Sequence, residues 1–259
     1  MRLCRCQIDG EPHFALIEGE ELALLAEPPF SRIVRSGRRV SFEAARLLAP
    51  VEPSKIVCVG LNYRAHAAEL RMALPEHPLL FLKPPSALLA PGADILLPKE
   101  SAEVHYEAEL AVVIGRRCRR VSPEQAHACV LGFTCINDVT ARDLQRAEVQ
   151  FTRAKGFDTF APLGPWIQTG LDPSSLAVGA RVNGTVRQAG STADMVFGAF
   201  ELVSFVSQGM TLLPGDVLAT GTPPGVGPLV AGDEVEIEVE GIGVLRNRVR
   251  NEERSSTGE

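Results

Sequence analysis

The stretch HYEAELAVVIG, residues 105–115, constrains the fold of this chain more than any other. Its residues alternate with a period of two, which predicts a β-strand. One face of that strand carries Ala108, Leu110, Val112 and Ile114. The opposite face carries Glu107, Glu109, Ala111 and Val113. Since the far end of this second face is apolar too, we expect both faces to be covered and the two glutamates to lie at the edge of the core.

Strand and turn patterns dominate most of the remaining chain. An apolar run at residues 55–59 predicts a buried strand, and Asn183-Gly184 between strand-like flanks predicts a hairpin. Acids alternate with valine or isoleucine over residues 233–239, as in a half-exposed antiparallel strand. Only three helices are expected, over residues 63–73 with Asn62 as the cap, 123–128 and 200–208. The expected class is therefore α+β, mainly β.

A stiff link, Ala49-Pro50-Val51-Glu52-Pro53, divides the chain, because each proline fixes its own φ. Residues 1–50 alternate short apolar stretches with turns and then show a helical pattern at residues 42–48, which predicts a small strand-rich N-terminal cap domain. We expect residues 51–251 to form the catalytic domain and residues 252–259 a flexible tail.

Charge and hydropathy argue against several classes of protein. A formal net charge of −6 argues against a nucleic-acid binder, and the only basic run, residues 116–120, is expected to be a solvated turn. No apolar run is long enough to cross a bilayer, and the first residues do not form a secretion signal. The six cysteines include no C-x-x-C pair. We therefore expect a cytoplasmic protein that binds neither nucleic acid nor a membrane.

Three carboxylates are candidate metal ligands. Glu107 and Glu109 lie about 6.5 to 7 Å apart along one strand face, where they repel each other unless a cation joins them. Asp138 follows the apolar run at residues 130–136, and the end of a strand is where side chains reach into a cleft. Oxygen ligands of this kind favour Mg²⁺, Mn²⁺ or Ca²⁺ over zinc. The alternatives are glutamates that face water and an aspartate that only caps a turn.

Other polar residues are candidates for catalysis. His66 and Glu69, three apart on the first predicted helix, share a face, so the carboxylate can orient the imidazole as an acid–base dyad. A surface polar pair is the alternative. Lys155 lies in an irregular, partly buried segment, where its ammonium group can neutralise an oxyanion. In GTPPGVG, which is no phosphate loop, Thr222 can approach a ligand carboxylate, although an ordinary hairpin also explains this motif.

Several separated motifs together resemble the fumarylacetoacetate hydrolase family. In order, they are VGLNYRAHAAEL, FLKP, HYEAELAVVIG, INDVTARDLQ, RAKGFDTFAPLGPW, VNG and LVSFVSQGMTLLPGDVLATGTPPGVG. The resemblance covers about residues 54–250 and implies a mixed β-roll or barrel-like catalytic domain, commonly assembled as a homodimer.

The resemblance also implies a role for each candidate residue. It implies that one Mg²⁺ or Mn²⁺ ion per chain is held by Glu107, Glu109 and Asp138. It implies catalytic roles for His66, Glu69 and Lys155, the lysine stabilising an enolate. It implies a substrate site lined by Arg142, Gln145 and Thr222.

The implied substrate is a small 2-oxo acid. Within the family the sequence is similar to bacterial 2-hydroxyhepta-2,4-diene-1,7-dioate isomerases and 5-oxopent-3-ene-1,2,5-tricarboxylate decarboxylases. We therefore expect an isomerase or decarboxylase of 2-oxo or 2-hydroxydienoic dicarboxylic acids in aromatic-acid catabolism. Arg142, Arg146 and Arg153 follow Asp138 closely and can hold a distal carboxylate. The alternatives are an acylpyruvate hydrolase, an oxaloacetate decarboxylase and a non-catalytic metal-binding module.

Overall fold

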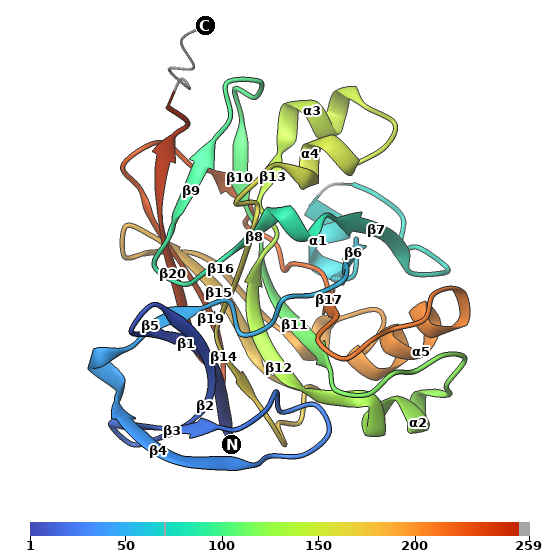
Figure 1. Ribbon diagram of the computed structural model, residues 1–259. Helices are drawn as coiled ribbons and strands as arrows, with labels where there is room; N and C mark the ends of the chain where they lie inside the picture. The colour runs from blue at the N-terminus through green and yellow to red at the C-terminus, as the bar shows by residue number, and fades with distance from the viewer. Residues whose placement is uncertain (70, 254–259) are drawn as a thin grey trace, which may run out of the picture.

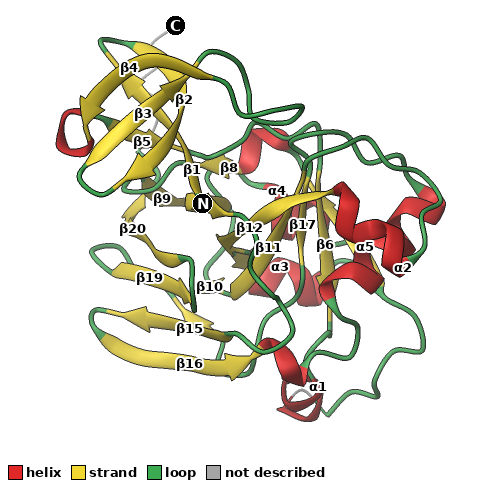
Figure 2. Ribbon diagram, turned by 90° about the horizontal axis from the view of Figure 1, so that it is seen from below, coloured by secondary structure: helices red, strands yellow, loops and turns green. Residues whose placement is uncertain are grey.

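The structure is a computed structural model that describes residues 1–69 and 71–253. Strands dominate it, and the described strands form three open sheets of twelve, five and three strands. The five-stranded sheet lies on the opposite side of the molecule from the helices α2 (Pro123–Ala126) and α5 (Ala199–Gly209) (Figures 1 and 2). The expected α+β class with mainly β structure is confirmed. The barrel-like form is not, because none of the described sheets closes on itself.

The twelve-stranded sheet joins the N-terminal strands to the strands that carry the candidate site. Its main path runs β4-β3-β2-β1-β14-β12-β11-β17-β6-β7, with β5 paired to β1 and β8 paired to β14. The bounds are β1 Arg2–Ile8, β2 Glu11–Glu18, β3 Glu21–Leu25, β4 Arg35–Ser41, β5 Arg46–Leu48, β6 Ile56–Gly60, β7 Leu79–Lys83, β8 Leu88–Leu89, β11 Ala108–Ile114, β12 Val130–Asn137, β14 Ala161–Gln168 and β17 Val217–Ala219.

The two smaller sheets complete the β structure. The five-stranded sheet, in the order β16-β15-β19-β20-β9, contains β9 Asp94–Leu97, β15 Ala177–Val182, β16 Thr185–Ser191, β19 Glu234–Val239 and β20 Gly243–Asn251. The predicted hairpin at Asn183-Gly184 is confirmed, since these two residues join β15 to β16 with φ values of 51° and 75°. The three-stranded sheet contains β10 Val104–Tyr106, β13 Thr140–Ala141 and β18 Gly227–Pro228.

The helices are short, and two of them were not predicted. The described α-helices are α1 Arg64–Glu69, α2, α3 Arg142–Ala147, α4 Thr152–Gly156 and α5, and the 3₁₀ turns are Phe42–Ala44, Pro85–Ala87, His127–Cys129 and Thr192–Asp194. The expected helix at residues 63–73 is wrong in length, because α1 ends at Glu69 and Arg71 has a left-handed φ of 55°. Residue 70 lies outside the described residues. No helix in the described part is long and apolar enough to cross a membrane.

The predicted helical pattern at residues 42–48 is also wrong. Only a 3₁₀ turn forms at Phe42–Ala44, and Arg46–Leu48 becomes strand β5, which pairs with β1 through Leu48 opposite Arg5. The proposed tail begins in described residues, where the backbone N–H of Glu252 donates to Leu97 O at 3.0 Å. The rest of that tail, residues 254–259, lies outside the described residues.

Strand β11 lies at the centre of the core. Every residue from Ala108 to Ile114 is buried, so the prediction that both faces are covered is confirmed. On one face, Leu110 and Val112 belong to the large apolar cluster shared with the five-stranded sheet. On the other face, Ala111 and Val113 pack in a second cluster with residues of β6 and β17. Glu109 shares this second face, so its carboxylate is held inside the protein.

Candidate metal centre

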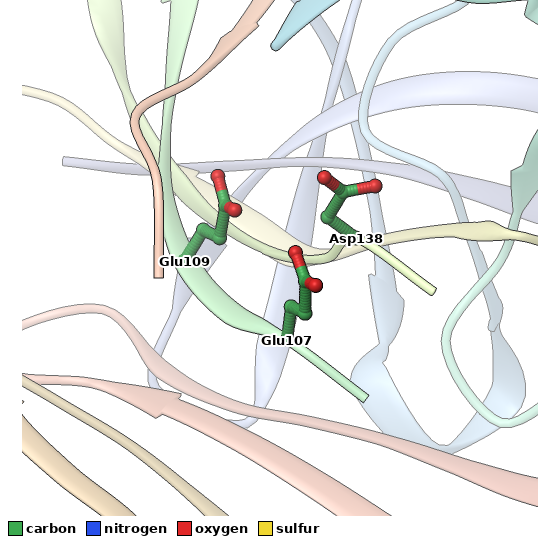
Figure 3. Close-up of side chains that lie close together, drawn as sticks. All are labelled: Glu107, Glu109 and Asp138. Atoms are coloured by element: carbon green, nitrogen blue, oxygen red, sulfur yellow. The ribbon is translucent and has the colours of Figure 1, made fainter. Parts of the chain in front are cut away.

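Three carboxyl groups meet where β11 and β12 pair. Glu107 lies between β10 and β11, Glu109 lies in β11, and Asp138 directly follows β12. The pairing of Ala108 with Asn137 fixes this neighbourhood, and the Asp138 N–H donates to Glu107 O at 3.0 Å. One oxygen from each carboxyl group lies within 4.8 Å of the others, and all three residues are buried (Figure 3).

Two buried lysines hold this carboxylate cluster from separate elements. Lys155 Nζ, on α4, donates to Glu107 Oε2 at 2.9 Å and to Asp138 Oδ2 at 2.7 Å. Lys83 Nζ, at the end of β7, donates to Asp138 Oδ1 at 2.6 Å and to Val139 O at 2.9 Å. Lys155 therefore lies in a short helix and not in the irregular segment that we expected, although its burial agrees with the prediction.

The electrostatic environments of the two glutamates differ. Burial raises the pKa of Glu107, but the Lys155 and Arg142 cations outweigh this effect and hold that pKa well below its ordinary value. Burial, followed by the negative charges of Asp138 and Glu107, raises the pKa of Glu109 well above its ordinary value. Glu109 Oε2 accepts a 2.7 Å hydrogen bond from Gly221 N–H, and no basic side chain among the described residues forms an ion pair with Glu109. Among the described residues, this carboxylate therefore has no basic side chain as a direct partner, although the charge of Lys155 opposes the rise of its pKa.

The residues present fit a divalent metal ion. Three buried oxygen donors within coordination reach of one another suit a hard cation such as Mg²⁺ or Mn²⁺. A cation bound there would pair directly with Glu109 and would relieve the repulsion among the three carboxylates. The structure brings together the three residues that the sequence predicted as ligands.

The predicted dyad also forms. His66 Nδ1 lies 3.0 Å from Glu69 Oε2, and the Gly225 N–H donates to Glu69 Oε1 at 3.3 Å. The imidazole is buried, with 8% of its side chain exposed, whereas the Glu69 side chain is 42% exposed. The pair therefore lies at the boundary between the protein interior and solvent, with His66 on the inner side and Glu69 on the outer side.

One cavity of about 430 Å³ connects these features. All of the predicted site residues except Glu69 and Arg153 line it, and Glu69 contacts His66, which does line it. Its polar wall also includes His105 and Arg146, and its apolar wall includes Leu61, Met72, Phe81 and Phe151. The cavity thus offers a carboxylate cluster at one position and room for a hydrocarbon chain beside it.

The arginines near α3 do not all face this cavity. Arg142 donates to Glu107 and to Gln145 Oε1, and Arg146 lines the cavity while pairing with Glu103. Arg153 was expected to join them, but its guanidinium pairs with Glu148 and is absent from the cavity lining. The structure therefore does not bring Arg153 to the cavity with the other two arginines.

A second polar network shapes the loop after β17. Thr222 Oγ1 donates to Ala108 O at 2.9 Å and accepts from Gln188 Nε2 at 2.8 Å. Asn62 donates to Thr220 O at 2.8 Å and accepts from Phe197 N–H at 2.9 Å. Asn62 therefore ties three segments together and does not cap α1 as we expected. This network fixes the backbone that carries Thr222 and Gly221 against the carboxylate cluster.

Sequence reasoning assigned no role to Lys83 or His105. Both lie in motifs that carried the family resemblance, FLKP and HYEAELAVVIG. The only signal for Lys83 is a lysine within a short apolar run before a proline, which is an uncommon place for a solvated charge. His105 lines the cavity with its Nε2 2.9 Å from Glu103 Oε1.

Comparison with known proteins decides the family. The model of the fumarylacetoacetate (FAA) hydrolase C-terminal domain matches residues 55–250, which is most of the chain. The chain belongs to the fumarylacetoacetate hydrolase family. A second model, described as Rv2993c-like, N-terminal, matches residues 1–50. The resemblance inferred from the motifs is confirmed.

Members of the fumarylacetoacetate hydrolase family with solved structures share the whole fold. A 5-carboxymethyl-2-hydroxymuconate delta-isomerase from Mycobacterium smegmatis is 47% identical, with a TM-score of 0.92 over 97% of this chain and 100% of its own. A 2-hydroxyhepta-2,4-diene-1,7-dioate isomerase from Mycobacterium marinum is 45% identical, with a TM-score of 0.92 over 98% of this chain and 100% of its own.

Two further members of the fumarylacetoacetate hydrolase family bear on the reaction. The mitochondrial oxaloacetate tautomerase FAHD2A of Bos taurus is 48% identical over 78% of this chain and 68% of its own length. A maleylpyruvate hydrolase from Sphingobium sp. SYK-6, solved with manganese(II) and pyruvate, is 32% identical, with a TM-score of 0.82 over 98% of this chain and 100% of its own. Isomerases, a tautomerase and a hydrolase are thus among the relatives of this chain.

Proposed function

We propose that the chain is a Mg²⁺- or Mn²⁺-dependent isomerase of 2-oxo and 2-hydroxydienoic dicarboxylic acids, which acts through an enolate. One observation carries this proposal: the buried cluster of Glu107, Glu109 and Asp138 shares a cavity with His66 and with the ammonium group of Lys155. A metal ion, when bound, polarises the carbonyl group of a chelated 2-oxo acid and stabilises the enolate. Isomerases at 45% and 47% identity support this reaction class.

His66 is proposed to move the proton. Its Nδ1 faces Glu69, which holds the imidazole in one orientation and favours the tautomer with hydrogen on that nitrogen. The other ring nitrogen is then free to take a proton from carbon C3 of the substrate and to return one elsewhere on the conjugated chain. A 2-hydroxydienoic acid and its 2-oxo isomer differ only by this proton shift, so no other reactant is needed.

Lys155 is proposed to stabilise the negative oxygen of the enolate. Its Nζ already binds Glu107 and Asp138 and has a further N–H to donate. Because Lys155 is buried, little water lies between its charge and a bound enolate. The attraction between the two charges is therefore strong, and the ammonium group is held in one orientation. Burial lowers the pKa of Lys155, but the negative charges of Asp138 and Glu107 outweigh this effect and raise that pKa above its ordinary value. The lysine therefore stays protonated.

The remaining cavity residues are proposed to select a dicarboxylic substrate. Arg142, Gln145 and Arg146 form a polar wall on α3, and Phe81 and Phe151 bound the space for the carbon chain. Thr222 lies in the loop next to the metal cluster, where it can accept a hydrogen bond from the 2-hydroxyl group of the dienol form. These contacts fit an acid with carboxylates at both ends of a short unsaturated chain.

Deuterium exchange tests the shared enolisation step. The protein loaded with Mg²⁺ is incubated in D₂O with 2-oxobutanoate, and loss of the C3 proton signal is followed by NMR. We expect exchange that depends on both the metal ion and the protein. A lack of exchange with every 2-oxo acid that binds would refute the proposal.

A hydrolase is the second candidate, favoured by the similarity to the maleylpyruvate hydrolase. In that reaction His66 and Glu69 would activate water instead of moving a substrate proton. Decarboxylation of a 3-carboxylated 2-oxo acid such as oxaloacetate would pass through the same enolate. Product analysis with one acylpyruvate, with oxaloacetate and with one 2-hydroxydienoate separates the three outcomes, because hydrolysis yields two acids, decarboxylation releases CO₂, and isomerisation leaves the composition of the substrate unchanged.

The assembly, location and domain division also remain proposals. We propose a homodimer, a cytoplasmic location and a division into a cap of residues 1–50 and a catalytic domain of residues 51–251. Sedimentation equilibrium tests the first of these proposals. Limited proteolysis near residue 51 tests the third.

A further inference from the structure

Lys83 is a buried ammonium group that does not line the substrate cavity. Its side chain is 0% exposed, and its Nζ contacts Asp138 Oδ1 and the backbone carbonyl of Val139. A buried lysine costs folding free energy unless its charge is paired and its hydrogen bonds are made. Asp138 thus carries one lysine on each oxygen, Lys83 on Oδ1 and Lys155 on Oδ2.

The charges around the cluster balance. As metal ligands, which bind in their ionised form, Glu107, Glu109 and Asp138 contribute three negative charges. Three bases contact two of these acids and contribute three positive charges: Lys83, Lys155 and Arg142. A divalent ion therefore brings the described cluster to a net charge of two positive, and the enolate of a 2-oxo acid, with one carboxylate and one enolate oxygen, carries two negative charges.

We propose that Lys83 is a positioning residue, which acts through Asp138 to give the metal-loaded site the charge that matches a dianionic enolate. This inference rests on the proposed function. Lys83 cannot touch the substrate from its place behind Asp138, because it is fully enclosed and does not line the cavity. Through its contact with Asp138 it adds one positive charge to the loaded site.

The two ligands of the site should respond to loss of Lys83 in opposite directions. Without this cation the empty cluster becomes more negative, so its affinity for Mn²⁺ should stay unchanged or increase. The loaded site then has one positive charge fewer, so a dianion that mimics the enolate should bind more weakly. A lysine that only maintained the fold would weaken both ligands together or neither.

Titration calorimetry with Mn²⁺, and then with oxalate on the Mn²⁺-loaded protein, measures both responses. Oxalate is a planar dianion with the two adjacent oxygen donors of a pyruvate enolate. For Lys83→Met we expect oxalate to bind about 10- to 50-fold more weakly, the order of magnitude for the loss of one nearby charge, with no loss of Mn²⁺ affinity. Lys83→Gln keeps an N–H donor without the charge, so it separates hydrogen bonding from charge.

Lys55→Met provides a matched control. Lys55, directly before β6, also pairs with a buried aspartate, Asp216, directly before β17, but neither residue belongs to the carboxylate cluster. This control should lose stability without any change in oxalate affinity. Unfolding curves for all variants are compared in parallel.

Each outcome has one meaning. A wild-type protein that binds neither Mn²⁺ nor oxalate overturns the proposed function, and the role of Lys83 with it. Wild-type binding of both ligands with an unchanged oxalate affinity in folded Lys83→Met overturns only the role of Lys83. If Lys83→Met and Lys83→Gln both fail to fold while Lys55→Met folds, Lys83 is structural and the inference is wrong. If oxalate binding falls in Lys83→Met and recovers in Lys83→Gln, the hydrogen bond matters and the charge does not.

Discussion

The backbone N–H of Gly221 donates a 2.7 Å hydrogen bond to Oε2 of Glu109. Gly221 adopts a φ of +98°, a backbone conformation that residues other than glycine rarely adopt, and it lies against Asn62. A Cβ atom built on Gly221 would lie 2.8 Å from Asn62 Cβ and 3.2 Å from Val59 O. Only glycine therefore allows the loop to come close enough to orient this carboxylate.

Gly221→Ala is expected to disturb both the fold and the metal cluster. The strained φ should lower the free energy of unfolding by about 1 to 3 kcal/mol, and the displaced N–H should weaken Mn²⁺ binding through Glu109. Gly232→Ala is the matched control, because Gly232 has the same φ of +98° with no atom within 4 Å of the added Cβ. Denaturant unfolding and calorimetry measure the two effects. Equal losses of Mn²⁺ affinity in both variants would contradict the orienting role of Gly221.

Glu109→Gln is expected to separate stability from metal binding. Burial and the charges of Asp138 and Glu107 raise the pKa of Glu109, so its ionised form is unfavourable in the folded, metal-free protein. A raised pKa of a carboxyl group makes ionisation destabilising, so removing this charge should raise the Tm of the metal-free protein at neutral pH. The variant should also lose the rise in Tm that Mn²⁺ gives the wild type.

The control for this variant is Glu11→Gln, since Glu11 is an exposed residue of β2 far from the cluster in the sheet order. It should keep both the wild-type Tm and its response to Mn²⁺. Thermal unfolding of the wild type and both variants, with and without Mn²⁺, gives all six values. A full Mn²⁺ response in Glu109→Gln would exclude Glu109 as a ligand.

His66→Ala is expected to keep the metal site and to lose turnover. The imidazole does not belong to the carboxylate cluster, so Mn²⁺ affinity should be unchanged. Loss of general acid–base catalysis should slow C3 deuterium exchange by about 10² to 10⁴. Glu69→Gln should cause a smaller loss, because it only weakens the orientation of the ring. His13→Ala, outside the cavity lining, is the control, and full activity in His66→Ala would show that the dyad is not catalytic.

The sequence predicted where the candidate ligands lie, because their places follow from local patterns. The period of two in residues 105–115 placed Glu109 on a covered face, and the end of an apolar run placed Asp138 at a strand terminus. Neither pattern contains the pairing of Ala108 with Asn137, which brings the two positions together. The family motifs supplied this tertiary information, since they identify a fold that is already known.

The missed features depend on contacts that no local pattern contains. Helices α3 and α4 have six and five residues, too short for a clear 3.6-residue period. The partner of Lys83 is 55 residues away along the chain, so its burial could not be anticipated from its neighbours. Lys155 and Arg153 lie two positions apart on α4, so their side chains point in different directions. Lys155 is buried, whereas Arg153 is exposed and pairs with Glu148, a difference that the sequence alone did not reveal.

The two arginines provide the last prediction, which concerns substrate selection. Arg146 lines the cavity, whereas Arg153 pairs with Glu148 outside it, although the two are seven positions apart and equally charged. Arg146→Ala should raise the KM for a dicarboxylic 2-oxo acid by about tenfold, the loss of one charge-assisted contact, and leave the KM for 2-oxobutanoate unchanged, because that acid has no distal carboxylate. Arg153→Ala should change neither. Steady-state kinetics with both substrates check this, and an equal effect of Arg146→Ala on both KM values would exclude a distal carboxylate site at Arg146.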